Sequence, residues 1–246
     1  MMTVFGTLIV LHIITGTVGL IAFWVPIATG KGSQPHRRWG RIGCYGFIGA
    51  GVLAIAMAIL SLTAYPDRVP SIEDRAAFRG LLGWMMLYLG LLTLGFADYG
   101  LAVVKHARNH KALRSFRYQA VIAAVMLSAF WSAIYGWQVG QPTMIMVAIF
   151  GLAAMAIQQL YIWRGEVPRT MYVGEHFRAL IGMGISAYTA FLSVGLVRYL
   201  PELVFNPIIW AGPSVVGVGL IIYFTHQGNK QKKRKATPAA AVGSKV

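Results

Sequence analysis

The sequence predicts an all-helical, polytopic membrane bundle of seven transmembrane helices, with six as the alternative count, the N-terminus outside the cell and the C-terminus inside (N-out/C-in). Three observations predict this fold. Of 246 residues, 57% are hydrophobic and 12% are charged, whereas soluble domains carry roughly 25% charged residues. Apolar runs of about 20 residues recur, and a helix of that length crosses the hydrocarbon core of a bilayer. Basic residues concentrate in alternate connections between these runs.

Each predicted helix corresponds to one apolar run. The runs lie at residues 3–28, 43–65, 81–104, 118–137, 143–163, 179–197 and 208–224. The first run is longer than the apolar core of a cleaved signal peptide, and no Lys or Arg precedes it. We therefore expect this helix to be retained in the mature protein. The last run is the weakest, because it contains Pro213 and several glycines. Together the runs form one transmembrane domain, residues 1–226. The basic segment 227–246 lacks apolar periodicity and is predicted to be a disordered cytoplasmic tail.

Lys and Arg side chains set the predicted orientation, because they resist translocation and remain in cytoplasmic connections. The connections after the first, third and fifth runs and the tail carry most of them: Lys31, Arg37, Arg38, Arg41, Lys105, Arg108, Lys111, Arg114, Arg117, Arg164, Arg169, Arg178, Lys230, Lys232, Lys233, Arg234, Lys235 and Lys245. The other side receives only Arg68, Arg75, Arg79 and Arg198. The net charge of +15 therefore indicates orientation rather than a nucleic-acid partner. The basic tail also predicts contact with anionic lipid headgroups of the bilayer, unless it serves orientation alone.

The sequence gives no support to several classes of chemistry. A single cysteine, Cys44, allows neither an intramolecular disulfide nor a cysteine-based metal or iron-sulfur site. The chain has no phosphate-cradling glycine loop, zinc-protease helix, nucleophile elbow or paired-carboxylate constellation. Hydrolase and NTPase mechanisms therefore lack support. Whether the protein is an enzyme stays open, and a non-enzymatic role is favoured.

Small residues recur every four positions in the second run. Gly46, Ala50, Ala54 and Ala58 would form one face of a helix. In lipid, such faces let two helix backbones approach closely. We therefore expect another helix to pack here. The same face would also serve a homo-oligomer or a larger membrane complex.

Two ionisable residues lie inside the predicted helices, where such groups are costly unless paired or solvated and are candidates for a functional site. His12 lies near the middle of the first run, and Asp98 lies towards the cytoplasmic end of the third. Each also has a structural explanation. His12 could bond a carbonyl or hydroxyl group of a neighbouring helix. Asp98 could pair with Lys105 or Arg178.

Histidines and arginines gather at the predicted cytoplasmic side. His36, Arg37 and Arg41 follow the first run, and Glu175, His176 and Arg178 precede the sixth. Arginine binds carboxylates and phosphates through paired hydrogen bonds. The predicted ligand site therefore comprises His12, His36, Arg37, Arg41, Asp98, His176 and Arg178. Its first predicted function is the binding or transport of a small anionic or lipid-like ligand, although the orientation rule alone also explains basic connections.

The histidines raise a second function, a b-type haem redox protein. A bis-histidine haem needs two ligands at matching depth, and His12 lies about 24 Å along its helix from the inner end. His106 and His176 are the pair that remains. The positive charge around His106 and His110 disfavours a divalent metal ion. A third hypothesis is an accessory subunit of a membrane complex, held by the small-residue face.

Several of these motifs together resemble a known family. The histidine and glycines of the first run, Lys31-Gly32 with His36-Arg37 and Gly40-Arg41, and the stretch from His176 and Arg178 to Thr189-Ala190-Phe191 carry the likeness. They resemble a bacterial family of multi-pass membrane proteins known as domain of unknown function 2306. The resemblance covers most of the chain and implies a membrane location and about seven helices, but no reaction. With the orientation, it predicts the bacterial cytoplasmic (inner) membrane.

Overall fold

The computed structural model describes residues 2–63, 75–195 and 207–236, which are helical with short connections and contain no strand. The long helices are α1 (Met2–Ala28), α2 (Gln34–Thr63), α4 (Met86–Lys105), α5 (Phe116–Gln138), α6 (Pro142–Ile162), α7 (Met171–Ala190) and α8 (Pro207–Ala236). The short elements are α3 (Arg75–Phe78), the π-helical segments η1 (Arg79–Met85) and η3 (Phe191–Gly195), and the 3-10 helix η2 (His110–Arg114). The predicted all-helical fold is confirmed.

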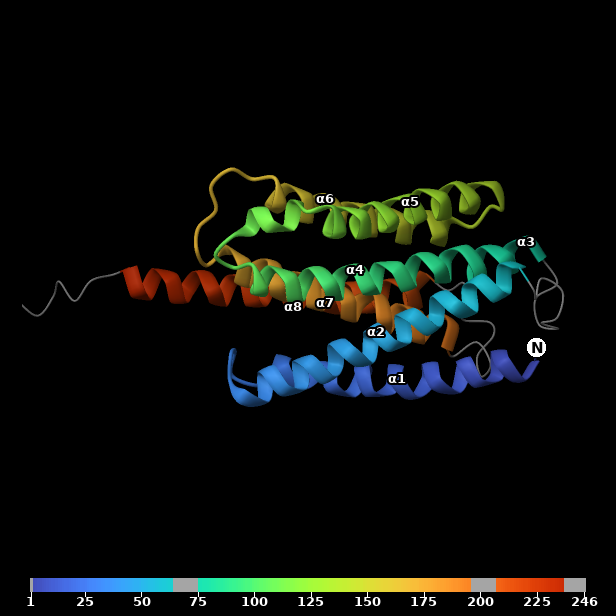
Figure 1. Ribbon diagram of the computed structural model, residues 1–246, viewed down its shortest axis with the longest axis horizontal. Coiled ribbons are helices and arrows are strands. Elements are labelled where there is room, and N and C mark those ends of the chain that lie inside the picture. Colours follow the sequence, from blue (N-terminus) through green and yellow to red (C-terminus); the bar gives the residue numbers. More distant parts are fainter. Residues whose placement is uncertain (1, 64–74, 196–206, 237–246) are drawn as a thin grey trace, which may run out of the picture.

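The long helices run alongside one another, and consecutive long helices point in opposite directions (Figure 1). The connections α1–α2, α4–α5 and α6–α7 and the end of α8 lie at the left of Figure 1, opposite the N-terminus. These are the segments that carry most of the basic residues, so we call this end of the bundle the basic end. The charge pattern of the sequence thus becomes a charge separation along the bundle.

Six helices are long and apolar enough to cross a membrane, which indicates a multi-pass membrane protein. They are Val4–Ala28, Gln34–Thr63, Arg79–Lys105, Phe116–Gln138, Pro142–Ile162 and Ile208–Lys230. The helix below this criterion is α7, because Glu175, His176 and Arg178 lower its mean hydropathy. The sequence had marked the last run as the weakest. Instead α8 meets the criterion and contains Pro213 inside a continuous helix.

Three helix boundaries differ from the predicted ones. The second helix begins at Gln34 rather than 43, so His36, Arg37 and Arg41 lie in its first turns and not in a loop. The sixth long helix begins at Met171 rather than 179 and therefore contains Glu175, His176 and Arg178. The last helix continues to Ala236, so the tail is helical up to that residue rather than disordered.

A few predicted features lie outside the described residues. They are the predicted helix ends at 65 and 197, Arg68, Arg198 and the tail from 237 onwards. The predictions for these positions stay predictions.

The small-residue face of α2 packs against α1, as expected from the spacing. A carbon atom added at Gly46 would lie 2.7 Å from the backbone nitrogen of Gly19, so the two backbones are in direct contact. Ala50 and Ala58 are buried as well. Much of the face that could have served an oligomer is therefore covered within the chain.

The centre of the bundle is the pair α4 and α7. Tyr88, Ala97 and Val103 of α4 are almost completely buried. Gly182 of α7 lies against the ring of Phe96, where an added carbon would come within 2.8 Å of the ring. The helices α1 and α2 lie on one side of this pair, and α5 and α6 lie on the other (Figure 1). This arrangement positions the site described next.

Candidate functional site

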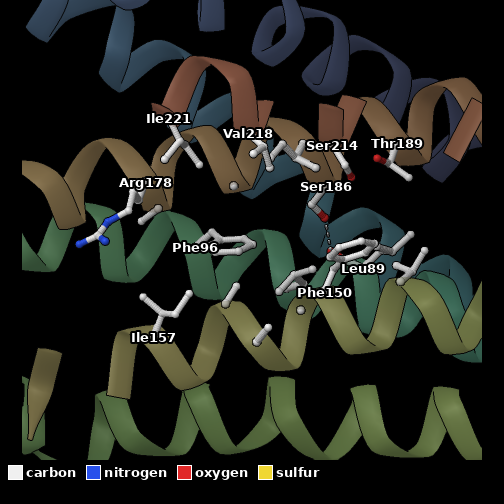
Figure 2. Close-up of a pocket in the computed structure, with 18 of the residues that line it drawn as sticks. Leu89, Phe96, Phe150, Ile157, Arg178, Ser186, Thr189, Ser214, Val218 and Ile221 are labelled. Atoms are coloured by element: carbon white, nitrogen blue, oxygen red, sulfur yellow. Dashed lines mark hydrogen bonds between the residues drawn. The ribbon is translucent and has the colours of Figure 1, made fainter. Parts of the chain in front are cut away.

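A cavity of about 540 Å³ lies between α4, α6, α7 and α8. Cavities of roughly 300–1,000 Å³ hold small organic ligands. Most of the residues around this one are apolar, among them Leu89, Phe96, Phe150, Ile157, Val218 and Ile221. Figure 2 shows Arg178 at one end of the cavity and Thr189 at the other. At about 1.5 Å of rise per helical residue, these two residues of α7 are about 16 Å apart along the helix. The cavity is therefore elongated.

Two contacts hold α6 beside the cavity. The Tyr88 hydroxyl of α4 donates to the Val147 carbonyl of α6 at 3.1 Å. Near the basic end, Arg114 Nε donates to the carbonyl of Ile162, the last residue of α6, at 3.0 Å. Between these points α6 lines the cavity instead of packing closely on α7 and α8.

The cavity has a buried floor and an exposed rim. Leu89 of α4 is 3% exposed, whereas Phe150 of α6 is 60% exposed and Val215 of α8 is 70% exposed. All three residues line the cavity. The cavity therefore opens at the surface between α6 and α8. In a membrane, apolar residues at such an opening face the hydrocarbon of the bilayer.

Polar groups converge at the basic end of the cavity. Glu175, only 2% exposed, forms an ion pair with Arg178. The Tyr99 hydroxyl donates to the second carboxylate oxygen of Glu175 at 2.9 Å. Arg178 Nε also donates to the Gly174 carbonyl at 3.2 Å. This network joins α4 to α7, and its three side chains line the cavity.

Gln158 of α6 is the most unusual lining residue. It is 3% exposed, and neither its amide nitrogen nor its amide oxygen has a hydrogen-bond partner among the described residues. Buried side-chain amides are normally bonded, and one that is not calls for an explanation such as a bound ligand or water. The amide of Gln158 is therefore available to form hydrogen bonds with a ligand or a water molecule in the cavity.

Hydroxyl groups line the other half of the cavity. They belong to Ser186, Thr189 and Ser214. Ser186 is hydrogen bonded at 2.9 Å to Thr93 of α4, which does not itself line the cavity. Thr189 Oγ1 is buried and has no partner in the described part of the chain. The π-helical segment η3 begins two residues later, and π-helical turns occur frequently at functional sites. The cavity thus has polar groups towards both ends and an apolar middle.

Most of the residues predicted as ligand contacts have hydrogen-bond or ion-pair partners within the chain. His12 Nδ1 lies 2.9 Å from the Ala50 carbonyl and connects α1 to α2. His36 Nδ1 lies 3.1 Å from the Pro26 carbonyl. Arg41 Nε donates to the Arg37 carbonyl one helical turn earlier, at 3.4 Å.

The same holds for Asp98 and His176. Asp98 pairs with Arg117 of α5 at 2.6 Å, and not with Lys105 or Arg178 as the sequence suggested. His176 Nδ1 lies 2.7 Å from the Gly100 carbonyl of α4. Of the predicted ligand residues, Arg178 is the one that lines the cavity within the described structure.

The two histidines considered as haem ligands are engaged with different helices. His106 Nε2 lies 3.2 Å from the Tyr118 hydroxyl of α5, whereas His176 bonds to α4. His106 and His110 do not share a helix turn either, because α4 ends before His106 and η2 begins at His110. Across residues 2–63, 75–195 and 207–236, no group of three or more His, Cys, Asp or Glu could hold a metal ion.

Lys31 ties the first connection to α8. Its ammonium group donates to the Pro26 and Ile27 carbonyls, each at 2.9 Å, and so satisfies the end of α1. It also lies 4.3 Å from the centre of the Phe224 ring. Partial burial lowers the pKa of Lys31, because the charged form loses water contacts. This basic residue therefore has a packing role.

The sequence reasoning missed Gln158, Tyr99 and Thr189. The clearest available signal was the pair Gln158-Gln159, two amides inside the otherwise apolar run 143–163. Polar side chains at that depth are costly unless bonded, which makes them candidates for function.

No protein-family model, curated protein or solved structure gives a significant match to the chain. The function is therefore inferred from the geometry of the cavity.

Proposed function

We propose that this chain is an integral membrane protein that binds a lipid-like amphiphile in the cavity between α4, α6, α7 and α8. The observation that carries the proposal is the cavity itself, an elongated apolar space with the network of Tyr99, Glu175 and Arg178 at its basic end. Gln158 lines the same cavity four residues before α6 ends at the basic end. An amphiphile has the matching distribution of chemistry, with one polar group and one apolar chain.

The opening of the cavity supports the bilayer as the source of this ligand. Its rim consists of exposed apolar residues on α6 and α8, such as Phe150 and Val215. A water-soluble anion would have to cross this apolar rim, whereas a lipid-like molecule already resides beside it. In addition, His36, Arg37 and Arg41 do not line the cavity. Of the two predicted ligand types, the lipid-like one therefore fits better.

The proposal includes seven membrane crossings, with α7 as the additional one. The helices α6 and α8 both end at the basic end (Figure 1), so α7 must return the chain to the opposite end before α8 begins. The polar residues of α7 have partners on α4 or within α7, as polar groups inside a bundle require. The distribution of Lys and Arg supports a cytoplasmic basic end and N-out/C-in orientation. The bacterial inner membrane and the family resemblance remain part of this proposal.

Photo-crosslinking tests the binding site directly. A 12-carbon alcohol with a diazirine in its chain would be irradiated with the purified protein in lipid nanodiscs, and the modified residues mapped by mass spectrometry. We expect saturable labelling of lining residues such as Leu92, Ala154 and Gly182. Unsaturable labelling confined to lipid-facing residues such as Leu127 and Leu160 would contradict the proposal, because it would report only surrounding lipid.

A matched pair of variants on α6 strengthens the test. Ala154 lines the cavity, whereas Ala156 is exposed and does not. Ala154→Phe fills part of the cavity and should reduce saturable labelling at least about ten-fold, which corresponds to about 1.4 kcal/mol. Ala156→Phe adds the same ring on another face and should leave labelling unchanged. Equal labelling of the two variants, both shown to be folded by thermal unfolding, would contradict cavity binding.

A further inference from the structure

We infer that Gln158 selects the polar head of the ligand, and that this head is uncharged and both donates and accepts a hydrogen bond, as the hydroxyl of a long-chain alcohol or a monoacylglycerol does. The inference rests on the proposed function, because it concerns the ligand of the same cavity.

A glutamine side chain has a donor at Nε2 and an acceptor at Oε1, and Gln158 has both free of partners within the described chain. A head that only accepts would satisfy the nitrogen and leave the oxygen unbonded. A hydroxyl group donates and accepts, so it can satisfy both amide atoms through small adjustments of one side chain.

The neighbouring glutamine shows that the unbonded state is not a general feature of α6. Gln159 Nε2 donates to Gln119 Oε1 of α5 at 2.8 Å, although its own oxygen has no partner in the described residues. Gln159 thus joins two helices and does not line the cavity. Gln158, one residue earlier, lines the cavity and makes no such contact.

Arg178 is the cation at this end of the cavity, and Glu175 already neutralises it through their ion pair. Glu175 also accepts from Tyr99, so both of its oxygens are engaged. An anionic head would have to compete with Glu175 for Arg178 and would bury a second negative charge beside it, which is unfavourable. An uncharged head meets neither obstacle.

The two ends of the cavity differ in the polar groups that they offer. Thr189 also has an unbonded buried oxygen, at the end opposite Arg178 (Figure 2). The lining at that end offers single hydroxyl groups, those of Ser186, Thr189 and Ser214, and Ser186 is already bonded to Thr93. Gln158 offers a donor and an acceptor on one side chain, and it lies four residues before the end of α6 at the basic end, where Tyr99, Glu175 and Arg178 also line the cavity. The head group therefore belongs at Gln158, and the chain extends towards Thr189.

A competition experiment tests the inference. Labelling by the diazirine alcohol would be competed with unlabelled 1-dodecanol, dodecyl methyl ether and dodecyl phosphate, which have the same chain and different heads. We expect 1-dodecanol to compete about ten-fold better than the ether, which only accepts, and better than the anionic phosphate. An ether or phosphate that competes as well as the alcohol would overturn the inference, and this comparison needs no variant.

Two variants test which residue causes the preference for the alcohol head. Gln158→Met keeps the unbranched shape of the side chain and removes both amide atoms. It should weaken competition by the alcohol about ten-fold and leave the ether unchanged. Thr189→Val removes the other unbonded group with little change in shape and should keep the preference for the alcohol. Loss of the preference in Thr189→Val, or its persistence in Gln158→Met, would overturn the assignment.

The outcomes separate the two levels of the proposal. If no competitor displaces the probe and Ala154→Phe retains the labelling, the proposed function itself fails. If competition is saturable and sensitive to Ala154→Phe but independent of the head group, the cavity binds amphiphiles and only the role of Gln158 is refuted.

Discussion

His12 is a polar residue at membrane depth whose contact indicates helix packing. Its ring nitrogen lies 2.9 Å from the Ala50 carbonyl, and side-chain hydrogen bonds inside membrane proteins contribute about 0.5–2 kcal/mol. His12→Ala should lower the free energy of unfolding in detergent by about 1 kcal/mol and leave cavity labelling unchanged. The matched control is His226→Ala at an exposed position of α8. Loss of labelling with unchanged stability would instead assign His12 to the ligand site.

The pair Asp98–Arg117 is expected to contribute little to stability. The side chains are 26% and 64% exposed respectively, and exposed ion pairs contribute at most about 1 kcal/mol because solvent screens them. Asp98→Asn should therefore change the free energy of unfolding by less than about 1 kcal/mol, with an even smaller change at high salt. A loss of several kcal/mol, or of cavity labelling, would show that Asp98 has a role beyond this pair.

The sequence could predict which residues lie at a given depth, but not which neighbours they face. Asp98 was placed at the correct end of its helix, yet its partner is on α5 because that helix lies beside Asp98 in the bundle. Gln158 and Gln159 have nearly the same depth, and their different environments follow only from the positions of α4, α5 and α7. Arg178 was predicted because it follows Glu175 and His176 at the predicted cytoplasmic side, where an arginine suits an anionic or polar ligand group.

At the scale of helices, the α1–α2 contact depends on the absence of a side chain at Gly46. A carbon added there would lie 2.7 Å from the Gly19 backbone nitrogen, and a backbone atom cannot move aside as a flexible side chain can. Gly46→Ala should therefore lower the free energy of unfolding by about 1–3 kcal/mol, the usual cost of overpacking.

Gly212→Ala in α8 is the matched control for this change, because nothing lies within 4 Å of the carbon that it adds. Thermal unfolding of both variants in the same detergent makes the comparison. Equal melting temperatures would show that the two helices are not packed as closely as described.

Helix positions were predictable because each apolar run became a helix, whereas helix ends were less so. Hydropathy marks the part of a helix suited to hydrocarbon, but backbone hydrogen bonding continues into polar sequence. For this reason α2 begins at Gln34, α7 begins at Met171 and α8 continues to Ala236, all through polar residues. The error in the predicted helix start was most important for α7. Glu175, His176 and Arg178 were predicted to precede this helix, but they lie inside it.

At the scale of the whole molecule, the cavity exists because α6 and α8 pack on different helices and not on each other. The α5–α6 hairpin packs on α4, and α8 packs on α7, where Gly217 lies against Ile185. The cavity is left between these two units, with α4 and α7 as its inner wall. Periodicity in a single sequence shows which residues are apolar but not which pairs of helices stay apart, so the cavity was not predictable.

Cysteine accessibility in intact cells tests the membrane arrangement most directly. Single cysteines would replace Gln138 at the end of α5, Gly165 in the α6–α7 connection and Gln227 in α8, all exposed, while the native Cys44 is buried. A membrane-impermeant maleimide should label Gln138→Cys in intact cells, and should label Gly165→Cys and Gln227→Cys only after lysis. If Gln138→Cys and Gln227→Cys were both labelled in intact cells and Gly165→Cys were not, α7 would not cross the membrane. Labelling of Gly165→Cys in intact cells would reverse the orientation and place the polar end of the cavity outside the cell.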